Sequence, residues 1–199
     1  MENQKTRQQI VAAAKTVFIR KGFDDTTMMD IADEADLSRR TLYAYFESKY
    51  DIYKAVIDSV MEQVLVKLVG IAALNLPPEQ KILEFTFGRF RVLKEMVDSN
   101  GTLRSGFFRN IWGLEHYRKD FDQKEKLLLQ QIIQEGKECG RFNVNNVRRT
   151  AEFFQNCMRG FEVPYIRGRI WKGNTREEVL YESKRLIHGA LGITEEKRQ

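Results

Sequence analysis

Cysteine, histidine and proline are scarce in this sequence, which contains two cysteines, two histidines and three prolines among 199 residues. Two cysteines cannot build a disulfide framework, so we expect a chain that works in a reducing compartment. The first residues contain no apolar stretch of the kind that forms the core of a secretion signal. No later segment reaches the roughly 18 apolar residues of a membrane-spanning helix. We therefore expect a cytoplasmic protein that makes no contact with a membrane.

Residues that interrupt helices are also few. Three prolines and 13 glycines leave room for long helices, and the sequence shows neither short alternating strands nor an internal repeat. Hydrophobic residues make up 42% of the chain, which is enough to bury a core. The spacing of apolar residues predicts an all-α fold of about nine helices, the later ones at about 48–74, 78–98, 102–112, 115–138, 146–166 and 175–191.

The common signatures of catalysis and metal binding are missing. The sequence has no HExxH and no GxSxG motif, and its two histidines, His116 and His188, belong to no metal-ligand cluster. A dyad of Cys157 and His188 remains open, with a buried structural cysteine as the alternative. We expect no catalytic residue, no metal and no cofactor, and an enzyme is the competing class of protein.

Net charge by itself does not indicate a polyanionic partner. The whole chain carries a formal charge of +5, but residues 1–50 contain eight basic and eight acidic residues. The first fifty residues are therefore neutral in total. Any prediction of nucleic-acid binding has to come from the order of the residues rather than from their composition.

Residues 22–46 contain the start and stop signals of two short helices. Gly22 stands where a helix C-cap glycine belongs, at the end of an amphipathic helix expected over about 4–21. Thr27 and Asp30 fit the capping-box pattern that opens the next helix, which should end near Asp36. Ala32 is a small residue at the expected helix crossing, and Asp36 tolerates the left-handed backbone that the turn requires. This arrangement predicts a helix-turn-helix.

The helix that follows Ser38 separates apolar from polar side chains. Its inner side carries Leu42, Tyr45 and Phe46, and its outer side and start carry Arg39, Arg40, Thr41, Tyr43 and Ala44. No acidic residue occurs between Leu37 and Phe46. Arginine can hold guanine through two hydrogen bonds, alanine can touch a thymine methyl group, and hydroxyl groups reach phosphates. This face suits the major groove of DNA, with Lys49 as a phosphate contact from the next helix. A small helical core with a solvated polar face is the alternative.

The run GFDDTTMMDIADEADLSRRTLYAYFESKYDIYKAV, residues 22–56, resembles the TetR family of bacterial regulators. Its most specific parts are Thr26-Thr27, Ile31-Ala32, Leu37-Ser38 and the string TLYxYFxSK that ends at Lys49, whereas Asp36 replaces a turn glycine. The resemblance implies that Arg39 and Arg40 reach base edges. It also implies that Thr27, Tyr43, Tyr45 and Lys49 bind phosphates, while Thr41 serves either purpose. The candidate DNA-binding residues are Thr27, Ser38, Arg39, Arg40, Thr41, Tyr43, Ala44, Tyr45 and Lys49.

The resemblance further implies two domains and three partners. A three-helix DNA-binding domain at residues 1–47 would precede a larger helical domain at 48–199, whose long first helix links the two. The partners would be a palindromic double-stranded operator, a second copy of the chain, and a small-molecule effector that releases the DNA from this repressor. A dimer is also expected on physical grounds, because specificity needs two half-sites roughly 34 Å apart.

Two sets of residues in the second domain follow from the family pattern. In the family the last two long helices pair with their copies, which makes Phe154, Cys157, Phe161, Leu186, Ile187 and Ala190 candidates for the dimer interface. The aromatic residues in the middle of the chain fall on helices that line the family's effector pocket, which makes Phe87, Phe90, Phe107, Phe108, Trp112 and Tyr117 candidates for that pocket. Both sets can equally be intrachain core. A regulator without a ligand, or an activator, remains an alternative function.

Overall fold

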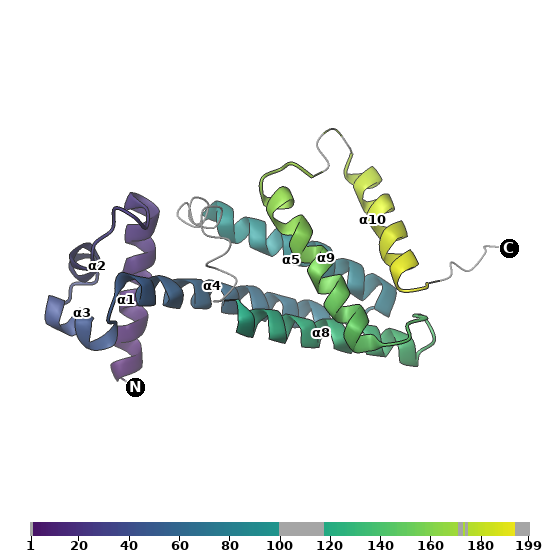
Figure 1. Cartoon of the computed structure of the whole chain (residues 1–199), viewed down its shortest axis with the longest axis horizontal. Helices are drawn as coiled ribbons and strands as arrows, with labels where there is room; N and C mark the ends of the chain where they lie inside the picture. The colour runs from purple at the N-terminus through teal and green to yellow at the C-terminus, as the bar shows by residue number, and fades with distance from the viewer. Residues whose placement is uncertain (1, 100–117, 171–172, 174, 194–199) are drawn as a thin grey trace. The chain divides into compact units, whose positions relative to one another are not determined.

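The computed structural model of the chain describes residues 2–99, 118–170, 173 and 175–193. These ranges contain eight α-helices and no strand (Figure 1): α1 (Glu2–Lys21), α2 (Met28–Glu34), α3 (Arg39–Tyr45), α4 (Lys49–Ala72), α5 (Pro78–Ser99), α8 (Lys119–Glu138), α9 (Val147–Ile166) and α10 (Arg176–Ala190). The predicted all-α fold is confirmed. The helix expected at 102–112 lies outside the described residues.

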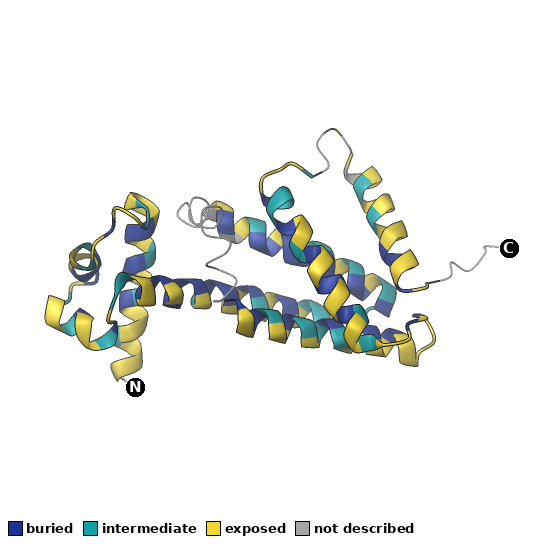
Figure 2. Ribbon diagram, viewed as in Figure 1, coloured by how far each residue is buried: buried dark blue, intermediate teal, exposed yellow. Residues whose placement is uncertain are grey.

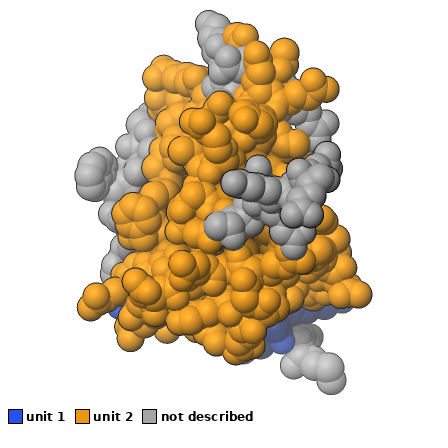
Figure 3. All heavy atoms as spheres, turned by 90° about the vertical axis from the view of Figure 1, so that its right-hand side faces the viewer, with its two compact units in different colours: residues 1–63, 95–120 blue, residues 64–94, 121–199 orange. Residues whose placement is uncertain are grey.

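The chain divides into two compact units, which Figure 3 shows in blue and orange. Unit 1 comprises residues 1–63 and 95–120, and unit 2 comprises residues 64–94 and 121–199. Helices α4 and α5 each contribute to both units. The sequence predicted a boundary at residue 48, where the long helix begins, whereas α4 contributes to unit 1 as far as Gln63.

The core of unit 1 is built from one face of each of the first four helices. Helix α1 contributes a stripe with the spacing predicted from the sequence, and none of its members is more than 1% exposed: Ile10, Ala14, Val17 and Phe18. The other helices add Ile31 and Ala32 from α2, Leu42 from α3, and Ile52 and Val56 from α4. Figure 2 shows these buried faces against the exposed outer sides.

The core of unit 2 draws on the second part of α4 and on α5, α8 and α9. Its fully buried apolar residues include Leu68, Ile82, Phe85, Leu129, Ile133 and Ala151. Gly88 lets α4 and α5 approach closely, because a Cβ atom there would overlap Cδ1 of Ile71. Lys81 on α5 forms an ion pair of 2.7 Å with Glu135 on α8. These contacts join three helices around an apolar centre.

A charged cluster lies inside this apolar core. Arg89 on α5, whose side chain is fully buried, donates through Nε to Oε1 of Glu125 on α8 and through Nη2 to Oε2 of Glu162 on α9, the latter at 3.0 Å. Gln155 on α9 donates to the other oxygen of Glu125 at 2.8 Å. Burial alone lowers the pKa of Arg89, but attraction by the two carboxylates outweighs it and raises that pKa. The cluster therefore ties α5, α8 and α9 together through a permanently charged guanidinium.

Helix α10 closes the described part of the chain. It begins with a capping box, in which the Thr175 side chain accepts from the backbone N–H of Glu178 and the Glu178 side chain accepts from the backbone N–H of Thr175. Beyond its end, the carbonyl of Leu191 accepts from the backbone N–H of Asn143 at 2.9 Å, which attaches α10 to the loop between α8 and α9. Most other residues of α10 are exposed (Figure 2).

The described ranges contain neither a candidate membrane span nor a cluster of metal ligands. None of the helices there is both long and apolar enough to cross a bilayer. Nor do three His, Cys, Asp or Glu side chains in these ranges come together where they could hold a metal ion.

Candidate nucleic-acid interface

Helices α2 and α3 form the helix-turn-helix that the sequence predicted. Thr27 caps α2 as expected, and its hydroxyl accepts from the backbone N–H of Asp30 at 3.1 Å. The turn between the helices is tight, because the backbone N–H of Leu37 donates to the carbonyl of Ala32 at 2.9 Å. Asp36 occupies this turn with a φ of 53°, which is the left-handed conformation where the family resemblance places a glycine.

Helix α3 is anchored from behind by two apolar side chains. Leu42 is fully buried, and Phe46, the C-cap residue, is 5% exposed. At the other end the Ser38 hydroxyl accepts from the backbone N–H of Thr41 at 3.0 Å and also bonds the Thr41 hydroxyl at 2.8 Å. Both ends of this short helix are therefore fixed by contacts that follow from the sequence around it.

The opposite side of α3 faces solvent. Arg39, Arg40, Tyr43 and Ala44 are exposed, while Thr41 and Tyr45 are half-buried. The guanidinium of Arg39 lies 5.5 Å from the ring centre of Tyr43, so these two side chains form one stacked surface. Within the described ranges Arg40 takes part in no side-chain hydrogen bond, ion pair or ring contact. The helix thus presents a positive face that no carboxylate of the described ranges neutralises through an ion pair.

Lys49 lies at the start of α4 and forms hydrogen bonds with the loop between α1 and α2. Its ammonium donates to the carbonyls of Phe23 and Asp24 at 2.7 and 3.1 Å and lies 4.6 Å from the centre of the Phe23 ring. The same ring packs 4.8 Å from that of Tyr53 on α4. An ammonium has three N–H donors, so one remains for a phosphate. Lys49, which is predicted to contact a phosphate, therefore also holds the loop against α4.

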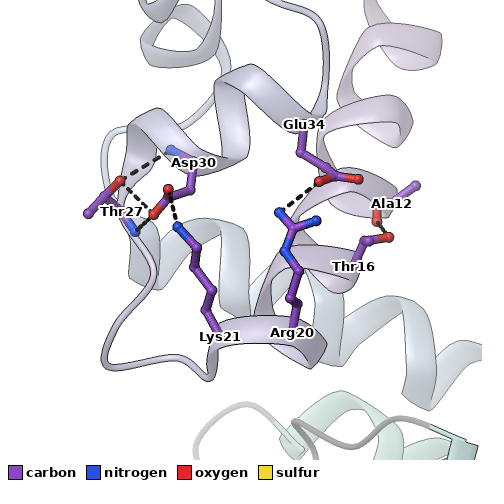
Figure 4. Close-up of polar contacts among 7 residues, drawn as sticks. All are labelled: Ala12, Thr16, Arg20, Lys21, Thr27, Asp30 and Glu34. Atoms are coloured by element: carbon purple, nitrogen blue, oxygen red, sulfur yellow. Dashed lines mark hydrogen bonds and ion pairs between the residues drawn. The ribbon is translucent and has the colours of Figure 1, made fainter.

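Two ion pairs brace α1 against α2 (Figure 4). Lys21 contacts Asp30 at 2.5 Å and Arg20 contacts Glu34 at 3.0 Å. The hydrogen bond from Lys21, together with those from the backbone and hydroxyl of Thr27, lowers the pKa of Asp30 to about 2. These two acidic residues of α2 are in this way paired with the basic end of α1.

Sequence reasoning did not single out Arg7, which the fold brings to the end of α3. Its guanidinium carbon lies 5.0 Å from the centre of the Phe46 ring. The two residues lie far apart in the sequence and share no local motif, so no sequence pattern connects them. Only the packing of α1 against the helix-turn-helix reveals this neighbour.

Comparisons with known proteins agree with this geometry. Residues 10–56 match the family model of bacterial regulatory proteins, tetR family, a range that runs from α1 into α4. The HTH-type transcriptional regulator YfiR of Bacillus subtilis (strain 168) is 29% identical over 159 residues, which are 76% of this chain and 76% of YfiR. Residues 10–56 therefore carry the DNA-binding domain of the TetR family.

Other relatives show how far this similarity extends. The HTH-type transcriptional regulator TtgR of Pseudomonas putida is 39% identical over 61 residues, but these cover only 31% of this chain and 29% of TtgR. The solved structure of a TetR-family transcriptional regulator from Pectobacterium atrosepticum covers 96% of both chains with a TM-score of 0.70 and 19% identity, so it shows the fold alone. The chain is a DNA-binding transcriptional regulator with the TetR fold.

The structure separates the residues expected at a TetR dimer interface into two groups. Phe154 and Ile187 are buried within the chain, as expected if they belong to the intrachain core. Cys157, Phe161, Leu186 and Ala190 are exposed. Phe153 on α9 and Tyr181 on α10 are exposed as well. Cys157 and His188 both lie in the described part of the chain, and no hydrogen bond joins them.

Two of the six residues expected at the effector pocket can be placed. Phe90 is buried and stacks on Tyr165 of α9 with ring centres 5.2 Å apart, and Phe87 is half-buried. Phe107, Phe108, Trp112 and Tyr117 lie outside the described residues.

Proposed function

We propose that this TetR family regulator is a repressor that binds a palindromic operator as a homodimer and releases it when a small molecule enters unit 2. The observation that carries the DNA-binding part is the outer face of α3. It exposes Arg39, Arg40 and Tyr43, has no acidic side chain between residues 37 and 46, and is anchored from behind by Leu42. Because its partner is chromosomal DNA, we expect the protein to act in the cytoplasm.

Arg40 is the side chain best suited to read a base. It is exposed and uncommitted, and its guanidinium can donate two parallel hydrogen bonds to O6 and N7 of guanine. Selecting bound fragments from genomic DNA with the full-length protein tests the proposal, because a repressor should enrich one palindromic sequence upstream of genes that it controls. Deleting the regulator should then raise the transcription of those genes.

A matched pair of arginine variants tests the role of Arg40. On the selected operator, Arg40→Ala should cost about 1–3 kcal/mol of binding free energy and relax the base preference at one position of each half-site. Arg20→Ala removes the same charge from an ion pair between α1 and α2 and should leave base preference unchanged. Equal base preferences in the wild type and in Arg40→Ala would remove Arg40 from the base-reading set.

The last two helices carry the surface that supports a homodimer. On α9, Phe153, Cys157 and Phe161 are exposed at intervals of four residues, which places them on one side of the helix. Phe153 is 70% and Phe161 53% exposed, and Leu186 on α10 is 68% exposed. Large apolar side chains at this spacing are costly in water and mark an interface with another molecule. A second copy presents the same stripe, so a twofold contact can bury both copies at once.

The dimer is tested by comparing two variants with equal changes of charge. Phe161→Glu places a carboxylate in the proposed seam and should convert the dimer to a monomer in analytical ultracentrifugation. Leu127→Glu makes the equivalent change on α8, where the side chain is 52% exposed, and should leave the dimer intact. If both variants sediment like the wild type, the interface lies elsewhere.

The effector part of the proposal rests on the TetR fold and on the aromatic residues of unit 2. The Phe90–Tyr165 stack joins α5 to α9, so a planar apolar molecule that inserts beside it would alter the packing of these two helices. Thermal-shift screening of a metabolite library identifies compounds that stabilise the protein. Any true effector must then bind more weakly to the operator complex, by the same factor by which it weakens operator binding. A stabilising compound that binds the free protein and the operator complex with equal affinity is not an effector.

A further inference from the structure

The neutral total charge of the first fifty residues conceals an uneven distribution of their cations. At the C-terminal end of α1, Arg20 and Lys21 are both paired with carboxylates of α2 (Figure 4). On α3, Arg39 and Arg40 have no carboxylate partner within the described residues. A surface whose arginines are already paired with carboxylates gains little from phosphate, whereas unpaired arginines retain their full attraction for it.

Arg7 belongs to the unpaired group although it lies on α1. It is exposed and, within the described ranges, contacts no carboxylate, and its one recorded contact is the face of Phe46 at 5.0 Å. Phe46 is the C-cap of α3, and its backbone N–H donates to the carbonyl of Leu42. The position of Arg7 is therefore defined relative to the end of the helix that carries the DNA-facing residues.

A second contact fixes this part of α1 against the helix-turn-helix. Gln9 donates through Nε2 to the backbone carbonyl of Ala35, the C-cap residue of α2, at 2.7 Å. The side chains of Arg7 and Gln9 thus engage the ends of α3 and α2, respectively. Rotation of α1 about its axis would break both contacts, so the placement of the Arg7 guanidinium is determined by the fold of unit 1.

The way in which Arg7 packs leaves its hydrogen-bonding edge available. A guanidinium that stacks on an aromatic ring uses its flat face, while its five N–H donors point outward in the plane. That edge matches two oxygens of one phosphate, and holding the group on a ring reduces the entropy lost on binding. A carboxylate would compete for the same donors, but none of the described residues pairs one with Arg7.

We propose that Arg7 contacts the phosphate backbone of duplex DNA, so that the nucleic-acid interface extends from α3 to the first helix of the chain. The inference rests on the proposed DNA binding of unit 1 and adds to it a contact outside the helix-turn-helix. Because a phosphate contact is independent of sequence, Arg7 contributes to affinity for every duplex and leaves base preference unchanged.

The salt dependence of binding to a random-sequence duplex tests this contact without knowledge of the operator. Each phosphate neutralised by a cation adds about 0.9 to the slope of log affinity against log salt concentration. Arg7→Ala should therefore lower the slope by about one per chain, and each substituted chain should make the affinity deficit grow by a factor of about ten for each tenfold decrease in salt. Arg7→Lys should keep the slope, since it keeps the charge.

Arg20→Ala is the matched control, because it removes the same side chain from the same helix and changes the net charge equally. Arg20 already has a carboxylate partner, so its loss should leave the slope at the wild-type value. The melting temperature of each variant is measured alongside, since an Arg7 that only packs on Phe46 would lower the melting temperature without changing the slope. If Arg7→Ala unfolds, Arg7→Gln, which keeps most of the aliphatic stem, carries the test.

Three outcomes separate the two proposals. A slope lowered in Arg7→Ala and Arg7→Gln but not in Arg20→Ala supports the contact. Slopes equal to the wild type in all three variants overturn it, while DNA binding itself stands. Failure of the wild-type protein to bind any duplex at low salt overturns the proposed function instead.

Discussion

Arg89 and Glu125 form an ion pair whose two side chains are completely removed from solvent. Arg89 reaches from α5 and Glu125 from α8, and each has a further partner on α9, Glu162 and Gln155 respectively. In an otherwise apolar core these groups cannot form hydrogen bonds with water in place of a lost partner. The pair therefore ties the mutual positions of three helices to a few hydrogen bonds.

Removing one member of this pair should strongly destabilise the protein. Glu125→Ala leaves the buried guanidinium without its main partner and should lower the free energy of unfolding by about 3–5 kcal/mol. Chemical denaturation measures the loss. Glu182→Ala breaks an exposed pair with Arg185 on α10 and should cost no more than about 1 kcal/mol. A small loss in Glu125→Ala would mean that water enters the cluster and solvates the guanidinium.

The contact between Lys21 and Asp30 should make the free energy of unfolding depend on pH in the acidic range. The pKa of Asp30 is about 2 in the folded chain, against an ordinary value of 3.8. Because the folded pKa is the lower one, the ionised carboxylate stabilises the fold above pH 3.8, and this contribution disappears as the pH falls toward 2. Unfolding curves of the wild type and Asp30→Asn should therefore differ most above pH 3.8 and converge below it. A difference that persists unchanged at the lowest pH would point to a cause other than ionisation.

The left-handed turn at Asp36 predicts a ranking of substitutions. With φ at 53°, glycine avoids the steric cost of a side chain, although it also gains freedom in the unfolded chain. We expect stability to decrease in the order Asp36→Gly, wild type, Asp36→Ala, with the two variants separated by about 1 kcal/mol in denaturant unfolding. Asp33→Gly, at a helical position of α2, should instead destabilise by roughly 0.5–1 kcal/mol. If alanine and glycine are equivalent at position 36, the turn does not hold this conformation in solution.

Lys49 should affect both folding and DNA binding. Lys49→Ala removes two hydrogen bonds to the loop between α1 and α2 as well as one cation near the duplex. The melting temperature should fall, and the salt slope on any duplex should drop by about one per chain. Arg40→Ala is the control for the first effect, because Arg40 is exposed, its side chain has no hydrogen bond or ion pair within the described residues, and its loss should not change the melting temperature. An unchanged slope in Lys49→Ala would show that this lysine holds the loop but does not contact DNA.

Much of the DNA-binding part could be predicted because its signals are local. The caps at Thr27 and Ser38 and the glycine at Gly22 each act within one turn of their own helix. The apolar stripe of α1 and the outward arginines of α3 follow from helical periodicity. The second domain was harder: Phe154 and Phe161 both fit an apolar seam, yet one is buried and the other exposed. Periodicity identifies an apolar face but does not say whether the same chain covers it.

The order of residues alone determined where the short helices α2 and α3 begin and which side of α3 carries arginine, since each depends on interactions between residues a few positions apart. Only the tertiary structure decided that Arg20 and Lys21 are paired, that Arg7 stacks on Phe46, and that Lys49 donates to two loop carbonyls. It alone placed Arg89 between carboxylates from two other helices. These contacts join residues far apart in the chain, and whether a charge is paired depends on how the helices pack.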